Sequence, residues 1–425
     1  MTSHQVELLF LDLALILVLA RGLGALATRI QQPPVVGEIL AGILLGPTLL
    51  GGAVSDRLFP TDVRPLMTAL ANIGVALFMF IVGLELEHRF VRGSTRATAG
   101  AALGSTLVPF ALGIALAFYL LNDHHTDQRA AFVVFVGLSV SVTAFPVLAR
   151  ILADRNLPRT AIGGLALATA ALVDVVAWTA LAGVQAVVGG ADDYWRVALL
   201  IPFTGLLIGL RPVLRRLLRP GGRGAPVSRL GLTVVLVGAL LSSAATEAMG
   251  MHYIFGAFLF GVVIPRDGAD LMRDEIIDRT GQITSLLLPV YFVVAGLKVD
   301  LRGVGADGLL ELGVILLVAV AGKFLGTYTG ARSQGLPGRA SAILAALMNT
   351  RGLTELVILG VGLELKLLDG RLYSLMVVMA LVTTAMTGPL LTFIGPERAE
   401  VPVGPAPSPK GEEVGTAGGR DRAAG

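Results

Sequence analysis

Long runs of hydrophobic residues follow one another along nearly the whole chain and are separated by short polar stretches. A run of about 20 apolar residues matches the length of a helix that spans the hydrocarbon core of a bilayer. Lipid offers the backbone no hydrogen-bond partners, so such spans must be helical. The pattern predicts an all-α, polytopic membrane protein with about thirteen transmembrane helices, near residues 7–28, 34–51, 66–86, 97–121, 129–152, 160–188, 195–217, 229–249, 252–265, 280–297, 309–331, 340–364 and 372–395.

Two of these runs are interrupted near mid-membrane depth by residues that break helices or carry charge. The first interruption lies in 136–150, around Phe145-Pro146, and the second lies in 344–356, around Asn349-Thr-Arg-Gly352. Broken helices are tolerated in a membrane only where they are buried in protein or line a cavity. Two such segments in corresponding halves of a chain indicate the binding site of a secondary transporter. Seven crossings separate them, so they should run in opposite directions, as in an inverted repeat.

Composition agrees with this class and divides the chain into two parts. Hydrophobic residues make up 54% of the 425 residues and charged residues only 15%. Residues 396–425 are rich in Pro, Gly and charge, which predicts a disordered cytoplasmic tail after a transmembrane domain over 1–395. The first span is too long for a cleavable signal peptide and lacks a processing site, so we expect none.

The distribution of Lys and Arg predicts the orientation. An external N-terminus puts eighteen of them in cytoplasmic loops and eight in external loops, and cytoplasmic loops are normally enriched in these residues. We therefore expect the N-terminus outside and the C-terminus in the cytoplasm. Only four of the 33 basic residues are Lys, which favours a bacterial origin and so a place in the cell membrane.

Several classes of site are excluded by what the chain lacks. It has no cysteine, which rules out disulfides, iron–sulfur clusters and thiolate zinc sites. His252 and the pair His124-His125 fall in or beside predicted external loops, lack metal-ligand spacing and are expected to be solvated. No nucleophile with a base lies within a span, so we predict neither an enzyme nor a cofactor or metal. The net charge of +3 does not indicate a nucleic-acid partner.

Few ionisable residues lie at membrane depth, where they are costly and usually functional. Asp174 falls about halfway through 160–188, and Lys323 lies near the middle of 309–331. A structural ion pair between these two is the alternative to a functional role. Arg351 and Glu355 are four residues apart and can pair on one helical face, which favours a structural, charge-balancing role. Asp12 and Glu247 lie nearer span ends and are interpreted as interfacial.

A carboxylate such as Asp174 in a low-dielectric cavity holds its proton more tightly than in water. Its oxygen atoms are also hard ligands suited to small cations. One group that holds either a proton or a cation, but not both, is sufficient for exchange. The carbonyls of broken helices can add cation ligands, and the opposed helix ends can balance charge.

Six segments in order carry a family resemblance that covers about residues 8–395. The chain resembles the second branch of the monovalent cation:proton antiporter family, which includes bacterial K⁺ or Na⁺/H⁺ antiporters and plant cation/H⁺ exchangers. The resemblance implies the Na⁺/H⁺ antiporter fold: two crossed, unwound helices in a mobile core domain, and a separate panel that forms a homodimer. The segments are Gln32–Pro47, Phe80–Leu86, Val142–Leu152, Ile254–Gly261, Leu288–Lys298 and Met348–Leu356.

The same resemblance implies roles for individual residues. Asp174, with Thr143, matches the family's ion- and proton-binding group, and Lys323 matches the basic residue that approaches it. The residues that match the lining of the unwound helices are Ser141, Ala144, Phe145, Pro146, Asn349, Thr350 and Gly352. One position departs from the family, because many members have Asp or Asn before the aspartate and this chain has Val173. A second carboxylate of the kind found in electrogenic relatives is therefore absent from this position.

The leading interpretation is electroneutral exchange of K⁺ or Na⁺ for H⁺ by alternating access. A proton-uncoupled cation pathway is the alternative within transport. A membrane sensor or scaffold that uses the same fold without transport is the alternative from another class, although the tail offers no folded signalling domain. The choice between K⁺ and Na⁺ depends on the geometry of the site and cannot be read from the sequence.

Overall fold

The computed structural model describes residues 2–49, 52–60, 62–85, 95–155, 157, 160–188, 199–218, 228–265 and 270–395. The predicted tail, 396–425, lies outside the described residues. Within the described ranges all regular structure is helical, as predicted. Among the described residues, nine helical segments are long and apolar enough to cross a membrane, with 129–154 taken as one, or ten if the bent pair 338–348 and 353–364 also counts as a single span. Each predicted span overlaps a helix, but the count of thirteen crossings stays a prediction because several of these helices are short.

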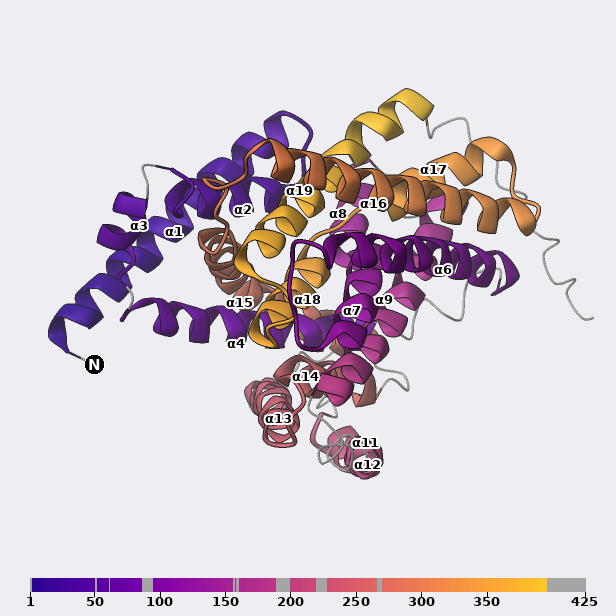
Figure 1. Ribbon diagram of the computed structural model, residues 1–425. Coiled ribbons are helices and arrows are strands. Elements are labelled where there is room, and N and C mark those ends of the chain that lie inside the picture. The colour runs from indigo at the N-terminus through magenta and orange to yellow at the C-terminus, as the bar shows by residue number, and fades with distance from the viewer. Residues whose placement is uncertain are drawn as a thin grey trace, which may run out of the picture.

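The helices fall into two groups that pack mainly within themselves (Figure 1). We call the first the panel group. It comprises α1 (Ser3–Arg29), α2 (Pro34–Leu45), α4 (Arg64–Glu85), α13 (Arg229–Ala248), α14 (Tyr253–Val263) and α15 (Asp270–Leu297). The short helices α3 (Ala53–Leu58), α11 (Leu200–Gly209) and α12 (Arg211–Leu217) lie at its edges in Figure 1.

The second group, which we call the core group, contains both interrupted segments. It comprises α6 (Thr95–Leu120), α7 (Arg129–Ser141), α8 (Phe145–Asp154), α9 (Ala161–Val188), α16 (Ala306–Ser333), α17 (Gly338–Met348), α18 (Leu353–Glu364) and α19 (Gly370–Ile394). Between the groups, the most extensive packing joins α15 to α18 and α2 to α19.

Glycines bring the helix backbones of each group into direct contact. A Cβ added at Gly104 of α6 would lie 2.1 Å from the carbonyl oxygen of Gly326 of α16, so only glycine fits there. Gly42 of α2 meets the backbone of Val293 and Gly296 of α15 in the same way. Small residues at helix contacts are typical of membrane proteins, in which tight packing replaces the hydrophobic effect between helices. These contacts explain why each group is compact by itself.

Hydrogen bonds between helix ends define two faces of the molecule. Gln5 at the start of α1 bonds to Asp62 just before α4, and we call this side the Ser3 face. At the other side, the Arg29 face, Gln32 after α1 bonds to the carbonyl of Ala385 in the second half of α19. The end of α8 also meets the end of α19, through Arg155.

The two broken helices therefore run in opposite directions, as an inverted repeat requires. The pair α7–α8 begins at the Ser3 face and ends at the Arg29 face. The pair α17–α18 runs the other way, because Arg339 near the start of α17 bonds to the carbonyl of Ile394 at the end of α19.

Candidate functional site

The two interruptions cross one another inside the core group. Helix α7 ends at Ser141 and α8 begins at Phe145, while α17 ends at Met348 and α18 begins at Leu353 with a bend of 45°. The backbone N–H of Ala144 donates to the carbonyl of Thr350 at 3.0 Å. The hydroxyl of Thr143 donates to the carbonyl of Met348 at 2.8 Å. The predicted crossing of unwound helices is thus present.

The sequence explains where the breaks fall, with one correction. Pro146 has no N–H to donate and its fixed φ suits the first turn of a helix, so a new helix starts there. Phe145 and Pro146 were expected in the unwound stretch, but they form the first turn of α8 and leave only residues 142–144 extended. At Gly352 an added Cβ would lie 2.4 Å from the side chain of Val147, so the two breaks approach too closely for a larger residue.

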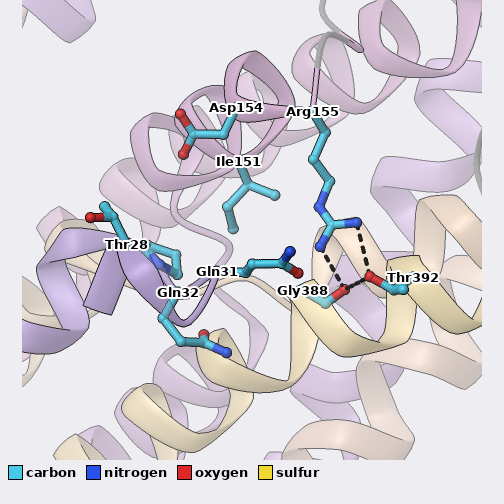
Figure 2. Close-up of a pocket in the computed structure, with 9 residues that line it drawn as sticks. Thr28, Gln31, Gln32, Ile151, Asp154, Arg155, Gly388 and Thr392 are labelled. Carbon is cyan, nitrogen blue, oxygen red and sulfur yellow. Dashed lines mark hydrogen bonds between the residues drawn. The ribbon is translucent and has the colours of Figure 1, made fainter. Parts of the chain in front are cut away.

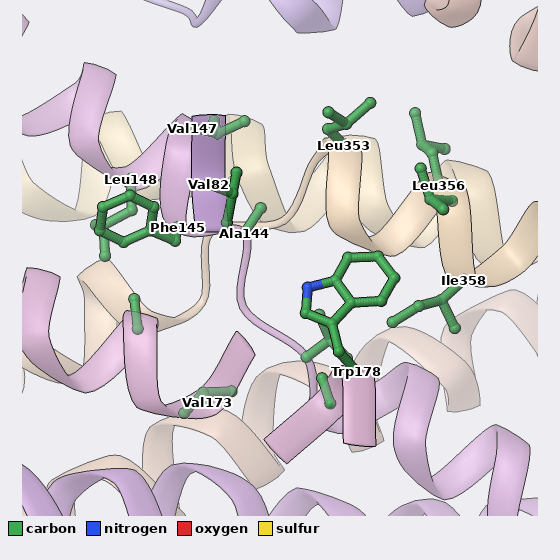
Figure 3. Packing of buried hydrophobic residues seen from close by; sticks show 14 of the residues in the cluster. Val82, Ala144, Phe145, Val147, Leu148, Val173, Trp178, Leu353, Leu356 and Ile358 are labelled. Atoms are coloured by element: carbon green, nitrogen blue, oxygen red, sulfur yellow. The ribbon is translucent and has the colours of Figure 1, made fainter. Parts of the chain in front are cut away.

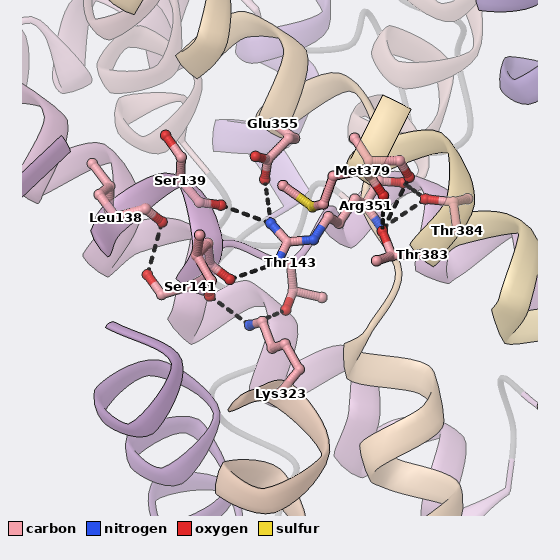
Figure 4. A network of polar contacts seen from close by, with 12 residues as sticks. Leu138, Ser139, Ser141, Thr143, Lys323, Arg351, Glu355, Met379, Thr383 and Thr384 are labelled. Carbon is pink, nitrogen blue, oxygen red and sulfur yellow. Dashed lines mark hydrogen bonds and ion pairs between the residues drawn. The ribbon is translucent and has the colours of Figure 1, made fainter. Parts of the chain in front are cut away.

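Lys323 is completely buried and bonds to the end of α7 (Figure 4). Its ammonium group donates to the carbonyls of Ser141 at 2.5 Å and Ser105 at 3.0 Å, and to the hydroxyl of Thr143 at 2.7 Å. The last carbonyls of a helix have no partner within the helix and carry partial negative charge. Lys323 therefore neutralises the end of α7 and fixes the unwound stretch next to it.

Arg351 acts on the same helix end from the second interruption (Figure 4). Its guanidinium group donates to the carbonyls of Ser139 at 2.7 Å and Val140 at 2.5 Å, and pairs with Glu355 at 2.8 Å. Arg351 and Glu355 are both completely buried. Thr384 of α19 accepts from the Arg351 N–H and donates to the Arg351 carbonyl. The spacing of four residues thus forms the expected ion pair, which also ties α7 to α18.

Asp174 lies on α9 beside this crossing and is only 2% exposed. Neither carboxylate oxygen has a hydrogen-bond partner of normal geometry. The groups that act on it electrostatically are the backbone N–H of Phe145, at the positive end of α8, and the ammonium of Lys323. Among the described ion pairs none joins Asp174 to Lys323, so the structural pair is not formed. A buried carboxylate without an ion-pair partner is a costly arrangement that indicates a functional role.

Val173 and Trp178, which flank Asp174 on α9, belong to a cluster of buried hydrophobic side chains (Figure 3). Val173 is 1% exposed. Trp178, one helical turn after Asp174, is also buried, and its indole N–H has no partner. The position before the aspartate therefore supplies no second titratable group, as the sequence indicated.

Other parts of the core group differ from the sequence-based expectation. His124 was expected to be solvated, but it is buried between two carboxylates, with Nδ1 at 2.5 Å from Asp369 and Nε2 at 2.5 Å from Glu311. Arg371 also bonds to Glu311, at 3.0 Å. His125 is exposed, as expected.

The sequence analysis also missed the acceptors of Lys323 and the role of Thr384 as a hydrogen-bond partner of Arg351. For Thr384 the only signal was the polar run Thr383-Thr384 within an apolar span.

A cavity of about 580 Å³ opens between the two groups on the Arg29 face (Figure 2). Its polar wall comes from the loop after α1 and from the ends of α8 and α19, and it includes Gln31, Gln32, Asp154, Arg155 and Thr392. Asp174 is not among the lining residues. The cavity therefore separates panel from core without reaching the buried carboxylate in this state.

Comparison with known proteins identifies the family. The model of the family described as "Sodium/hydrogen exchanger, transmembrane" matches residues 14–395. The chain belongs to this family. Among its exchanger relatives, Cation/H(+) antiporter 20 of Arabidopsis thaliana is 39% identical over 91% of this chain and 48% of its own length. The Na(+)/H(+) antiporter NhaS4 of Synechocystis is 36% identical over 94% of this chain and 100% of its own length.

A yeast relative and a solved structure extend the comparison. The K(+)/H(+) antiporter 1 of Saccharomyces cerevisiae is 32% identical over 99% of this chain and 50% of its own length. The chain thus spans about half the length of its plant and yeast relatives. The sodium proton antiporter MjNhaP1 from Methanocaldococcus jannaschii has a TM-score of 0.62 at 14% identity, covering 92% of this chain and 97% of that one. This likeness shows that the two chains share a fold.

Proposed function

We propose that this chain exchanges a monovalent cation, K⁺ or Na⁺, for H⁺ across a membrane. The observation that carries the proposal is Asp174, a buried carboxylate with no ion pair and no hydrogen bond of normal geometry among the described residues, beside two crossed helix breaks. The named relatives support it, since they include cation/H⁺, Na⁺/H⁺ and K⁺/H⁺ antiporters. Because the cations in these names differ, we leave the choice between K⁺ and Na⁺ to experiment.

In the proposed cycle, Asp174 binds either a proton or the cation, and the core group carries it from one face to the other. Lys323 and Arg351 neutralise the partial negative charge of the carbonyl end of α7. A bound cation is therefore not needed to balance that helix end and can be held by Asp174. In this state the Thr143 hydroxyl lies between Lys323 and Met348. We therefore assign Thr143 a part in holding the unwound stretch in addition to the predicted ion contact.

We also propose that the protein lies in the cell membrane as a homodimer, with the Ser3 face outside. The excess of Lys and Arg in the loops of the Arg29 face supports the orientation. The side of α1 that carries Phe10, Leu11 and Val18 is exposed and apolar, which suits contact with lipid or with a second panel group.

The test is cation-evoked proton flux in proteoliposomes with K⁺, Na⁺, Li⁺ and Rb⁺ in turn. Asp174→Asn should abolish the flux, because an amide can neither release a proton nor supply an ionic ligand. Asp12→Asn is the matched control, since Asp12 is another buried aspartate but lies in the panel group on α1. Near-normal exchange by Asp174→Asn would overturn the proposal. Cation flux without proton movement would favour the uncoupled pathway.

A further inference from the structure

Tyr373 connects the two groups of helices on the Ser3 face. It lies in the first turn of α19, in the core group, and is 1% exposed. Its hydroxyl donates to the carbonyl of Ala295 at 3.1 Å, in the last turn of α15 of the panel group. Any movement of the core group along the panel must break this buried hydrogen bond.

Other contacts close the same face around Tyr373. The N–H of Asp300, in the loop after α15, donates to the hydroxyl of Ser374 at 3.0 Å. His252, before α14, lies 3.8 Å from the carboxylate of Glu364 at the end of α18. Between these contacts remains a cavity of about 30 Å³, lined by residues that include Asn72, Tyr253, Tyr291, Val361, Glu364 and Tyr373. That is room for only one or two water molecules.

Deeper in the molecule, an aromatic pair lies one helical turn from Asp174. Trp178 follows Asp174 by one turn on α9. Further along α9, Gln185 accepts from the backbone N–H of His252, so the helix runs from Asp174 through Trp178 toward the Ser3 face. The ring of Trp178 contacts Phe255 of α14 edge-on, with the ring centroids 6.3 Å apart. This contact again joins core to panel.

The opposite face is held far less tightly. There the cavity between the groups is about 580 Å³, and the hydrogen bond that crosses it among the described residues is the one from Gln32 to Ala385, at 3.2 Å. The two groups are thus joined by several hydrogen bonds on the Ser3 face, whereas a wide cavity lies between them on the Arg29 face (Figure 2).

We propose that Tyr373 is the positioning residue of a gate that holds the Ser3 face shut. The proposal rests on the proposed function, because alternating access requires the Ser3 face to open once in each cycle. Breaking the Tyr373–Ala295 bond lets the core group leave the end of α15, opens the small cavity and narrows the wide one. Removing the hydroxyl therefore shifts the resting population toward the state that is open at the Ser3 face. For one neutral hydrogen bond the shift is on the order of five-fold.

The experiment uses the natural absence of cysteine. Asn72→Cys places a reporter in the small cavity, Ile151→Cys places one in the wall of the wide cavity, and Gly303→Cys marks the freely exposed Ser3 face. Each is reacted with a membrane-impermeant maleimide from either side of the membrane. In the parent, Asn72→Cys should react much more slowly than Gly303→Cys from the Ser3 side.

Adding Tyr373→Phe should raise the Asn72→Cys rate on the order of five-fold and lower the Ile151→Cys rate. Tyr119→Phe is the matched control, since this tyrosine is partly exposed at the end of α6, and it should change neither rate. Equal Asn72→Cys rates in the two tyrosine variants would overturn the proposal. A rise at both reporters would also overturn it, because it would show general loosening and not a gate.

Labelling needs no transport, so this test is separate from that of the proposed function. If the labelling shift appears in a protein that exchanges no cation, the gate stands and the exchange proposal fails. If exchange is normal and the shift is absent, only the gate fails. Initial rates give a second readout: Tyr373→Phe should change the apparent KM for the cation differently on the two sides.

Discussion

Three buried charges near the helix crossing have different surroundings, and this difference separates positioning from ion binding. Lys323 donates to two backbone carbonyls and one hydroxyl, and Arg351 donates to two backbone carbonyls and to Glu355, whereas Asp174 has no ion-pair partner among the described residues. The sequence predicted that all three lie at membrane depth, and the resemblance placed Lys323 near Asp174. The acceptors on Ser105 and Ser141 could not be predicted, because they depend on how backbones more than 180 residues away in sequence pack against α16.

Lys323→Gln should reduce stability and alter the pH dependence of exchange. An amide in place of the ammonium leaves at least one buried carbonyl without a donor, which costs about 1–3 kcal/mol. The loss of a positive charge near Asp174 favours the protonated carboxyl, so the pH profile of exchange should move to higher pH. Thermal unfolding in detergent and flux between pH 6 and 9 measure the two effects.

Lys366→Gln is the control, since Lys366 is exposed in the loop between α18 and α19. Lys366→Gln should change neither the thermal stability nor the pH profile of exchange. A pH profile for Lys323→Gln that coincides with the parent, despite lower stability, would mean that Lys323 serves only to cap α7.

Element boundaries were predictable wherever backbone chemistry fixes them. Pro146 starts α8 and Gly352 precedes α18, and both breaks appeared in the sequence because they interrupt apolar runs. The loop after α6 was misread. The local sequence around His124-His125 is polar and predicts solvent exposure. The partners of His124 are Glu311 in α16 and Asp369 at the start of α19, and no local pattern connects these residues to this loop.

The His124 cluster should make the Ser3 end of the core group sensitive to pH. Burial alone lowers the pKa of His124, but hydrogen bonds to Asp369 and Glu311 outweigh burial, and the pKa is raised above its ordinary 6.5. Burial raises the pKa of Asp369, but the hydrogen bond and charge of His124 and the backbone N–H groups of Leu372 and Arg371 together lower it below its ordinary 3.8. The ion pair between His124 and Asp369 is therefore strongest at pH values between the lowered pKa of Asp369 and the raised pKa of His124. The contribution of His124 is complete below pH 6.5 and is lost as the pH rises through its raised pKa.

His124→Gln should therefore cost about 2 kcal/mol near pH 6 and progressively less at higher pH. Most of the cost comes from Glu311, because Asp369 is half exposed. Melting temperatures of parent and variant from pH 5.5 to 9 measure this difference, with the exposed His125→Gln as control. A difference that stays constant over this range would show that His124 is neutral in the folded protein.

At the scale of the whole molecule, hydropathy predicted the class and the resemblance predicted the separation into core and panel. Sequence periodicity cannot show which helices pair, because every membrane helix is apolar on most sides. The pairing is decided by contacts such as Gly104 with Gly326 and Gly42 with Gly296, where two backbones meet. These contacts hold the helices of each group together, so we expect the movement of the proposed cycle at the interface that contains Tyr373 and the wide cavity.

Charge movement by the whole molecule is the remaining prediction. Val173 is packed among apolar side chains, Glu355 is paired with Arg351 and Lys323 is saturated by oxygen acceptors. Asp174 is then the one group at the crossing that is free to exchange its proton. Exchange of one proton for one monovalent cation moves no net charge, so the rate should follow the pH and cation gradients but not the membrane potential.

A potential is worth about 2.3 kcal/mol per elementary charge per 100 mV, so electrogenic exchange would respond strongly. The test imposes a valinomycin-set K⁺ diffusion potential on proteoliposomes at fixed pH, with Na⁺ as the transported cation, and compares proton flux with and without the potential. Vesicles with Asp174→Asn give the background leak. Equal flux at both potentials is expected. Flux driven by voltage in the parent but not in Asp174→Asn would mean that a second proton moves in each cycle, and Lys323→Gln and Glu355→Gln would then show which residue carries it.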